Sequence, residues 1–170
     1  MSFEIISIGP ADDFIGTRTL IRYYADTLQP GPREFVQIEF ANFPMHFAAP
    51  EGALLMARNG EGKPAGCVAF RKTIKHDTCE MKPLFVRVDA RGLGLGRAPI
   101  SMLEKSAVDA GYGRMKLGTF SNMTIAHHLY LAAGFRPIPS GESGKMDGLI
   151  WFEKELSPPT KVLAVEPDPK

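Results

Sequence analysis

Three closely spaced glycines between an apolar run and a helix-like segment constrain this chain most. The run from Leu84 to Val88 is strand-like, and the stretch from Arg91 to Arg97 reads RGLGLGR before apolar residues recur at helical spacing. Glycine lets a phosphate approach the backbone closely, and the first turn of a helix presents unpaired N–H groups and a positive dipole end. The pattern therefore predicts a strand-to-helix turn that binds an anionic phosphate.

Two common phosphate-binding loops do not fit these glycines. A P-loop ends in Gly-Lys-Ser/Thr, whereas Gly96 is followed by Arg97 and Ala98. The dinucleotide fingerprint has glycines at its first, third and sixth positions, a spacing that Gly92, Gly94 and Gly96 do not match. A nucleotide- or SAM-binding α/β enzyme is therefore disfavoured.

The rest of the sequence predicts an α/β domain. Hydrophobic periodicity and turn residues indicate strands at 3–8, 54–58, 64–71, 79–88, 115–120 and 149–154, helices at 14–28, 97–110 and 122–133, and a short helix with a loop within 33–50. A strand, a helix and a strand in succession around the glycine turn predict a parallel strand pair. Residues 1–156 are expected to form one domain, and the proline-containing stretch 157–170 a flexible tail.

Composition and charge narrow the function classes. With 170 residues, 44% of them hydrophobic, the chain suits one domain with its own core. A formal net charge of +1 argues against a nucleic-acid surface, and no apolar run is long enough to span a membrane. The N-terminus lacks a secretory signal pattern, so cytoplasmic residence is expected. Cys67 and Cys79 are expected to be buried thiols, and no metal site is indicated.

The glycine turn and its flanks resemble one known family. Arg91, Gly94 and Gly96 match position by position the acetyl-CoA motif Arg/Gln-x-x-Gly-x-Gly/Ala of the GCN5-related N-acetyltransferase (GNAT) family. Residues 80–87 are similar to that family's fourth strand, and 122–135 to its helix ending in Leu-Tyr-x-x-x-Gly-Phe. The resemblance implies a single GNAT-like α/β domain, with a mixed, mostly antiparallel sheet flanked by helices and one parallel strand pair splayed around acetyl-CoA.

The resemblance also implies a cofactor site made mostly of backbone. The turn would bind phosphates, the fourth strand would hydrogen-bond the pantetheine arm, and an N–H near Val86 would stabilise the oxyanion. Pro83 departs from the family pattern and removes a strand donor, which fits a bulge or an unpaired position and could alter the local register. Asn122 matches a cofactor-binding position, although helix capping explains it equally well. The expected cofactor-binding residues are Phe85, Val86, Val88, Arg91, Gly92, Leu93, Gly94, Leu95, Gly96, Arg97 and Asn122.

Two side chains are predicted to move protons. Tyr130 falls at the tyrosine of the family's helix pattern, which implies that it protonates the departing thiolate; simple packing is the alternative. Glu80 is the candidate base, directly or through water, because an amine of pKa about 10 is mostly protonated at neutral pH. A salt-bridged or solvated charge at the strand end explains Glu80 equally well. His46, His127 and His128 are weaker rivals, with exposure expected for the last two.

The implied activity is acetyl-CoA-dependent transfer of an acetyl group to a primary amine of a small molecule, by direct attack in a ternary complex. A non-catalytic acyl-CoA-binding module and a protein N-terminal or lysine acetyltransferase remain alternatives. The aromatic and methionine residues at 35–47 fit either a substrate wall or plain core. Many family members dimerise, so the resemblance is compatible with a homodimer.

Overall fold

A seven-stranded sheet with helices on both faces organises this chain. The computed structural model describes residues 2–9, 14–28, 32–39, 45–139 and 148–156. In chain order its elements are β1 (Phe3–Ser7), α1 (Ile15–Asp26), α2 (Pro32–Glu39), the 3₁₀ helix η1 (Met45–Phe47), β2 (Ala53–Asn59), β3 (Pro64–Lys72), β4 (Thr78–Val86), the 3₁₀ helix η2 (Val88–Ala90), α3 (Arg97–Asp109), β5 (Arg114–Phe120), α4 (Thr124–Ala132), β6 (Arg136–Ile138) and β7 (Leu149–Glu155).

The strand order is β1-β2-β3-β4-β5-β7-β6. Among the described strands, β4 and β5 pair in parallel and every other neighbouring pair is antiparallel. The structure therefore confirms the predicted mixed, mostly antiparallel sheet with one parallel pair.

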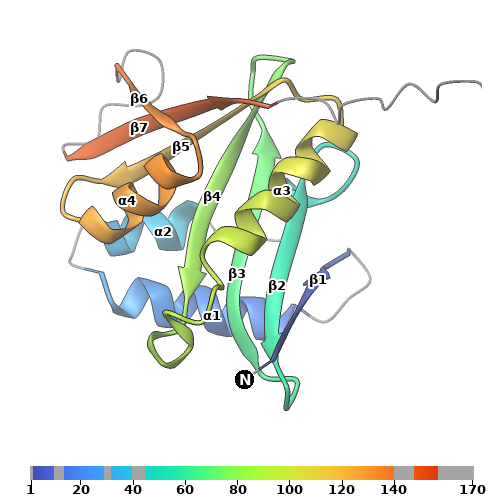
Figure 1. Cartoon of the computed structure of the whole chain (residues 1–170), viewed down its shortest axis with the longest axis vertical. Helices are drawn as coiled ribbons and strands as arrows, with labels where there is room; N and C mark the ends of the chain where they lie inside the picture. The colour runs from blue at the N-terminus through green and yellow to red at the C-terminus, as the bar shows by residue number, and fades with distance from the viewer. Residues whose placement is uncertain (1, 10–13, 29–31, 40–44, 140–147, 157–170) are drawn as a thin grey trace, which may run out of the picture.

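Two hydrophobic layers lie on opposite faces of the sheet. Figure 1 shows α3 crossing one face of the central strands while α1 crosses the other. Successive residues of a strand point to opposite faces, so Leu55 and Val68 pack in the cluster with α3, whereas Leu54 and Cys67 pack in the cluster with α1. Tyr130 of α4 joins the cluster on the α3 side. The central strands are therefore covered on both faces, as in other α/β domains.

The β4–α3–β5 unit follows the predicted strand–helix–strand order. Pro99 is buried in the first turn of α3, where the N–H that proline lacks has no partner within the helix. Gly111, with φ +95°, follows the helix end. Local signals at both ends of α3 were therefore sufficient to predict it.

A β-bulge lies in β4 at the position of Pro83. Cys67 pairs with Phe85 and Ala69 with Lys82, so three steps along β4 match two steps along β3. One extra residue is therefore accommodated between Lys82 and Phe85, which is the first of the two possibilities that the proline left open, because a residue without an N–H is tolerated where the strand ladder is interrupted.

Two predicted boundaries were wrong. β4 ends at Val86 and not at Val88, because the chain turns at Arg87 into η2, where the Ala90 N–H donates to the Arg87 carbonyl (3.0 Å). α4 begins only at Thr124, and no side chain caps it, so Asn122 precedes the helix without capping it.

Strand β6 was not predicted. It has three residues and includes Pro137, which an edge strand tolerates because one side of it has no partner strand. The short helix within 33–50 is confirmed as α2, while residues 40–44, 140–147 and the proposed tail 157–170 lie outside the described residues. Both cysteines are buried free thiols, as expected. No helix among the described residues has the length and apolar character needed to cross a membrane.

Gly66 allows β3 and β4 to approach each other beside the bulge. A Cβ at this position would lie 2.7 Å from the Phe85 carbonyl oxygen, a backbone atom that cannot move without displacing β4. We expect Gly66→Ala to lower the free energy of unfolding by about 1–3 kcal/mol, measured by urea denaturation. Gly60→Ala is the control, since its nearest neighbour would be the Ser2 hydroxyl oxygen at 3.7 Å. Equal effects of the two substitutions would contradict the prediction.

Candidate active site

The candidate site begins where β4 and β5 part. The two strands pair only at Thr78 with Arg114, Cys79 with Met115 and Glu80 with Lys116. β4 then continues to Val86 and β5 to Phe120 without further pairing, and Figure 1 shows the strands diverging. The result is a break in the backbone pairing between β4 and β5, called the opening below, as the predicted splayed pair requires.

Val86 presents backbone groups to this opening. The Arg87 N–H donates to the Ala65 carbonyl of β3 (2.9 Å), and backbone groups of successive residues in an antiparallel strand point to opposite edges. The N–H and C=O of Val86 therefore point away from β3, toward the edge that β5 has left. The carbonyl accepts a hydrogen bond from Arg91 Nε (3.1 Å). The Val86 N–H is then the backbone donor that a ligand in the opening could use.

The turn before α3 has an open backbone with two glycines in the left-handed region. Gly92 and Gly94 have φ of +77° and +85°, values that favour glycine. A Cβ on either residue would meet no atom within 4 Å, so the space above them is open. Among the described residues, the N–H groups of residues 92–97 make no loop hydrogen bonds to other backbone groups. The residues present therefore fit an anionic phosphate group.

The other residues of the turn differ in what they offer. Gly96 has negative φ, and a Cβ there would lie 3.2 Å from the Leu129 side chain, so this glycine lets α3 and α4 pack closely. The Leu95 side chain is buried, which leaves only its backbone available. Arg91 and Arg97 are exposed, and their charges face solvent near the turn.

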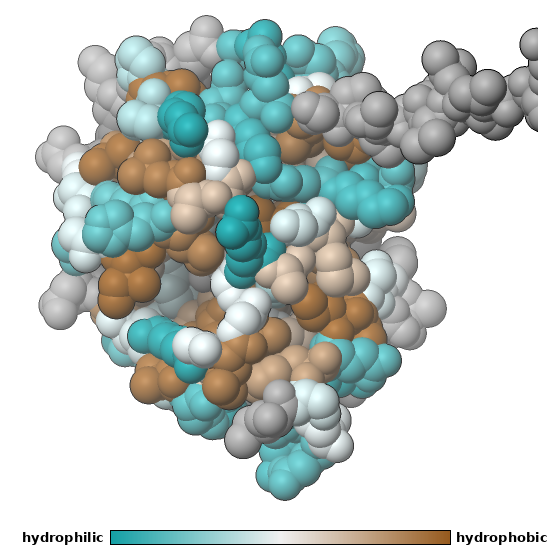
Figure 2. Space-filling view, viewed as in Figure 1, coloured by the Kyte–Doolittle hydropathy of each residue, from teal (hydrophilic) through white to brown (hydrophobic). Residues whose placement is uncertain are grey.

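Exposed apolar side chains surround the turn and α4. Figure 2 shows hydrophobic residues gathered on this face over α4 and over the segment between β4 and α3. The exposed residues there are Val88 and Leu93 before α3 and Ile125 and Leu131 on α4. A ligand that combines phosphates with an apolar arm would find both kinds of surface here.

Tyr130 is buried on the α3 side of the opening. Its ring packs against Phe135 and Phe152, each with centroids 6.2 Å apart. Burial, and to a smaller extent the nearby Tyr24, raise the pKa of Tyr130 well above its ordinary value. The phenol is therefore neutral across the physiological range and can donate a proton or hydrogen bond. Its role in catalysis remains a prediction.

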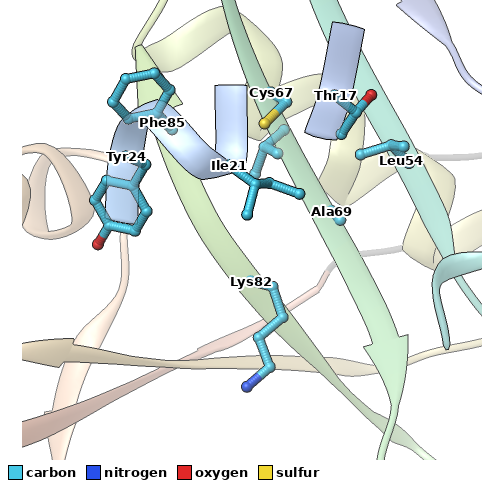
Figure 3. A pocket seen from close by; sticks show the side chains of 9 residues that line it. Thr17, Ile21, Tyr24, Leu54, Cys67, Ala69, Lys82 and Phe85 are labelled. Atoms are coloured by element: carbon cyan, nitrogen blue, oxygen red, sulfur yellow. The ribbon is translucent and has the colours of Figure 1, made fainter. Parts of the chain in front are cut away.

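Tyr24 of α1 lies beside the opening and was not among the residues that the sequence analysis singled out. Its ring lies 5.3 Å from that of Phe85 in β4, and its hydroxyl donates to Met123 Sδ (3.9 Å) just beyond β5, so it bridges the two sides of the opening. Burial raises the pKa of Tyr24 to about 12. Figure 3 shows its hydroxyl and the Lys82 ammonium pointing away from the apolar pocket between α1 and β3. The adjacent tyrosines 23 and 24 gave no sequence signal that distinguished one from the other.

Glu80 belongs to an ion cluster in which Glu80 and Lys82 are buried and Arg71 is half-buried. Its Oε1 accepts a hydrogen bond from Lys82 Nζ (2.6 Å), and its Oε2 accepts one from Arg71 Nη2 (3.2 Å). Burial alone would raise the pKa of Glu80, but Lys82 and Arg71 together hold the pKa below its ordinary value. The salt bridges expected if Glu80 has only a structural role are therefore present, and its carboxylate is ionised at neutral pH. A role in proton transfer remains a prediction.

A broad groove surrounds the start of β4. It is lined by the β3–β4 hairpin, η1 and β5, and both Glu80 and Lys116 reach it. His46 is exposed along the same groove. His128 is exposed as predicted, whereas His127 is half-buried, with Nε2 hydrogen-bonded to the Phe120 carbonyl oxygen (3.0 Å). Helix α4 packs this histidine against the sheet, which is why the exposure predicted for it was wrong.

The predicted cofactor residues gather in two places. Phe85, Val86 and the turn 91–97 lie on one side of the opening, while Asn122 is exposed directly after β5 on the other. Val88 lies outside β4, and its carbonyl accepts the Arg91 N–H (3.3 Å). The structure therefore brings β4 and the turn together. Val88 lies outside the strand, so it cannot bind a pantetheine arm as part of the β4 edge in the way that was predicted.

Comparison with known proteins agrees with this architecture. The chain matches the model of the acetyltransferase (GNAT) family over residues 18–135. It is 31% identical to an uncharacterised N-acetyltransferase of Schizosaccharomyces pombe over 72% of this chain and 75% of that protein. It is 25% identical to human N-acetylaspartate synthetase over 78% of this chain but only 42% of the human protein.

A solved structure has the same fold. A Salmonella typhimurium protein, described as an acetyltransferase with its cofactor acetyl-CoA, superposes with a TM-score of 0.65. The two chains are 18% identical, and the match covers 93% of this chain and 98% of the other. Together with the parted β4–β5 pair and the glycine turn, the family match over residues 18–135 leads to one assignment: this chain belongs to the GNAT acetyltransferase family.

Proposed function

We propose that this protein is an acetyl-CoA-dependent N-acetyltransferase that acetylates a primary amine of a small molecule. The observation that carries the proposal is the opening between β4 and β5, with the glycine turn at one side and a buried pair of tyrosines nearby. The acetyl-CoA of the Salmonella typhimurium structure supports this donor. The human relative is named for an acetylated amino acid, which supports a small acceptor.

The donor would be held mainly by backbone. The N–H groups of residues 92–97 are proposed to bind its phosphates, assisted by the charges of Arg91 and Arg97. The Val86 N–H is proposed to bind further along the opening and to stabilise negative charge that develops on the acetyl oxygen. Asn122 lies across the opening and is proposed as an additional polar contact.

Two side chains are proposed to manage protons. Bound acetyl-CoA supplies the thioester that the amine attacks and the sulfur that leaves. Tyr130 is proposed to give its proton to that sulfur, since its raised pKa keeps it protonated. Glu80 stays ionised because of its two cationic partners, and it is proposed to take the amine proton through water.

A second candidate function is a non-catalytic acyl-CoA-binding module. Two observations favour it. Glu80 is already ion-paired with Lys82 and Arg71, and the raised pKa of Tyr130 makes it a weaker acid than a free phenol, so both groups are less suited to proton transfer. A protein N-terminus or lysine presents the same primary amine and is the alternative acceptor. Activity with small amines distinguishes the proposed function from both of these alternatives.

Gly94→Ala tests the phosphate turn. Alanine at positive φ costs about 1 kcal/mol of stability, and its methyl group would fill the space above the turn. We expect the dissociation constant of acetyl-CoA to rise about tenfold, equivalent to about 1.4 kcal/mol, measured by the ligand-induced shift of the melting temperature. CoA should shift the wild-type melting temperature similarly, and SAM should not.

Gly111→Ala is the matched control. Gly111 has a comparable φ of +95° and equally open surroundings, but it follows α3 at the end away from the turn. It should lose similar stability and keep its acetyl-CoA affinity. If both variants bind acetyl-CoA as tightly as the wild type, residues 92–97 do not form the phosphate site.

Tyr130→Phe tests the acid. We expect kcat to fall on the order of a hundredfold with little change in acetyl-CoA affinity. Because the pKa of Tyr130 is raised, the wild-type enzyme should show no alkaline loss of activity from this group below pH about 10. Tyr23→Phe is the control, because Tyr23 is 45% exposed. Unchanged turnover of Tyr130→Phe would remove Tyr130 from the mechanism.

Glu80→Gln separates a base from a structural ion pair. The folded-state pKa of Glu80 is lowered, so its stabilising contribution is present above the unfolded pKa of about 4.3 and is lost as pH falls through the folded pKa. At pH 7 we expect the variant to lose about 3 kcal/mol of unfolding free energy, because Lys82 stays buried without its carboxylate partner. In acid the stabilities of variant and wild type should converge.

Activity provides the second measurement for Glu80→Gln. If Glu80 is the base, the loss of kcat should shrink as pH rises toward the amine pKa, since more of the acceptor is already neutral. Glu104→Gln is the control, because Glu104 pairs with Lys154 (2.7 Å) away from the groove. It should lose stability without a pH-dependent change in kcat. A loss of kcat in Glu80→Gln that is the same at every pH would assign Glu80 a structural role.

A further inference from the structure

The groove at the start of β4 is placed to receive the acceptor. Glu80 and Lys116 line it and are also the last residues paired before β4 and β5 part. Arg71 of β3 pairs with Glu80 in the sheet register and lines the groove as well. A molecule in this groove therefore lies directly beside the opening where the acetyl group is proposed to be held.

The described lining of this groove is positively charged. Two carboxylates line the groove, those of Glu51 and Glu80. Four cationic side chains also line it: Arg71, Lys72, Lys75 and Lys116. Both carboxylates are already ion-paired, Glu51 with Lys72 (2.6 Å) and Glu80 with Arg71 (3.2 Å). Lys82 does not line the groove but forms an ion pair with Glu80, so it adds a further positive charge nearby. The excess of positive charge favours an anionic group on the molecule that binds here.

Lys116 is held in position at the inner end of the groove. Its Nζ lies 5.2 Å from the centroid of the Trp151 ring, which is 7% exposed. The ring packs on Gly118, where a Cβ would come within 3.2 Å of it. Among the described residues, Trp151 Nε1 has no hydrogen-bond acceptor. A positioned ammonium and a buried N–H without an acceptor thus lie together where the strands part.

We propose that the acceptor carries a carboxylate beside its amine, and that Lys116 and Arg71 bind this carboxylate in the groove. The inference rests on the proposed acetyl transfer and specifies the substrate class as amino acids or other aminocarboxylates. An anionic group on the acceptor offsets the repulsion that the cationic groove exerts on an ammonium ion. The same cations lower the pKa of a nearby amine, which increases the neutral fraction able to attack.

Matched acceptors test the substrate class. Initial rates of CoA release would be compared for L-phenylalanine and phenethylamine, L-lysine and cadaverine, and L-aspartate and its dimethyl ester. We expect at least one carboxylate-bearing member to exceed its partner in kcat/KM by about tenfold or more, as the loss of a charge-assisted contact predicts. Equal or better turnover of the partners lacking carboxylate would overturn this inference and leave the acetyltransferase proposal intact.

Lys116→Met tests the residue. Methionine keeps the apolar packing on Trp151 and removes the charge. KM for the preferred aminocarboxylate should rise about tenfold, which narrows its advantage in kcat/KM over its partner, while the acetyl-CoA-induced shift in melting temperature stays unchanged. Lys116→Arg should retain most of the activity.

Lys105→Met is the control, since this exposed lysine pairs with Asp109 on α3. An unchanged KM in a folded Lys116→Met variant would remove Lys116 from the acceptor site. If no acceptor of either kind is acetylated although acetyl-CoA still raises the melting temperature, the proposed small-molecule acetyl transfer fails together with this inference.

Discussion

The separation of β4 from β5 after three residue pairs is the constraint on which the rest of the site depends. A sheet normally satisfies strand N–H and C=O groups across its full width, and here one edge of β4 loses its partner in the interior of the molecule. Several features of the chain adapt to that loss. The bulge at Pro83 interrupts the ladder, Gly66 keeps β3 close, and Arg91 satisfies the Val86 carbonyl.

The two faces of the sheet surround the opening with different chemistry. On the α3 side the cluster around Tyr130 is aromatic, and burial keeps the phenol neutral. At the start of β4, Glu80 and Lys82 are charged and buried and Arg71 is half-buried, which is tolerated because each charge has an opposite charge within hydrogen-bonding distance. Strand alternation produces this division, since Glu80 and Lys82 point to the face opposite the one that Cys79 and Met81 fill.

Local patterns in the sequence predicted the parts of the fold that local physics controls. The glycine turn, the helix after it and the bulge at Pro83 each depend on backbone preferences of a few neighbouring residues. β6 was missed because three residues at a sheet edge show no periodicity. Tyr24 and the Arg71–Glu80 pair were missed for another reason: their contacts depend on the register between strands and helices distant in sequence.

The three glycines of the turn show how one motif combines separate physical requirements. Gly92 and Gly94 are needed for their positive φ and for open space above the backbone, whereas Gly96 is needed because Leu129 of α4 packs against it. A motif match alone does not separate these causes. The first two bear on ligand binding, and the third on how α4, and with it Tyr130, is positioned beside α3.

In the proposed reaction the cations around Glu80 affect both partners of the proton transfer. They lower the pKa of the Glu80 carboxyl, which makes it a poorer base, and they also lower the pKa of an amine bound nearby, which makes the amine easier to deprotonate. The difference between the two pKa values therefore changes less than either value alone. A cluster of this kind would favour amine deprotonation mainly through the field of Arg71, Lys82 and Lys116, with Glu80 balancing part of the positive charge and taking the proton that the water relays.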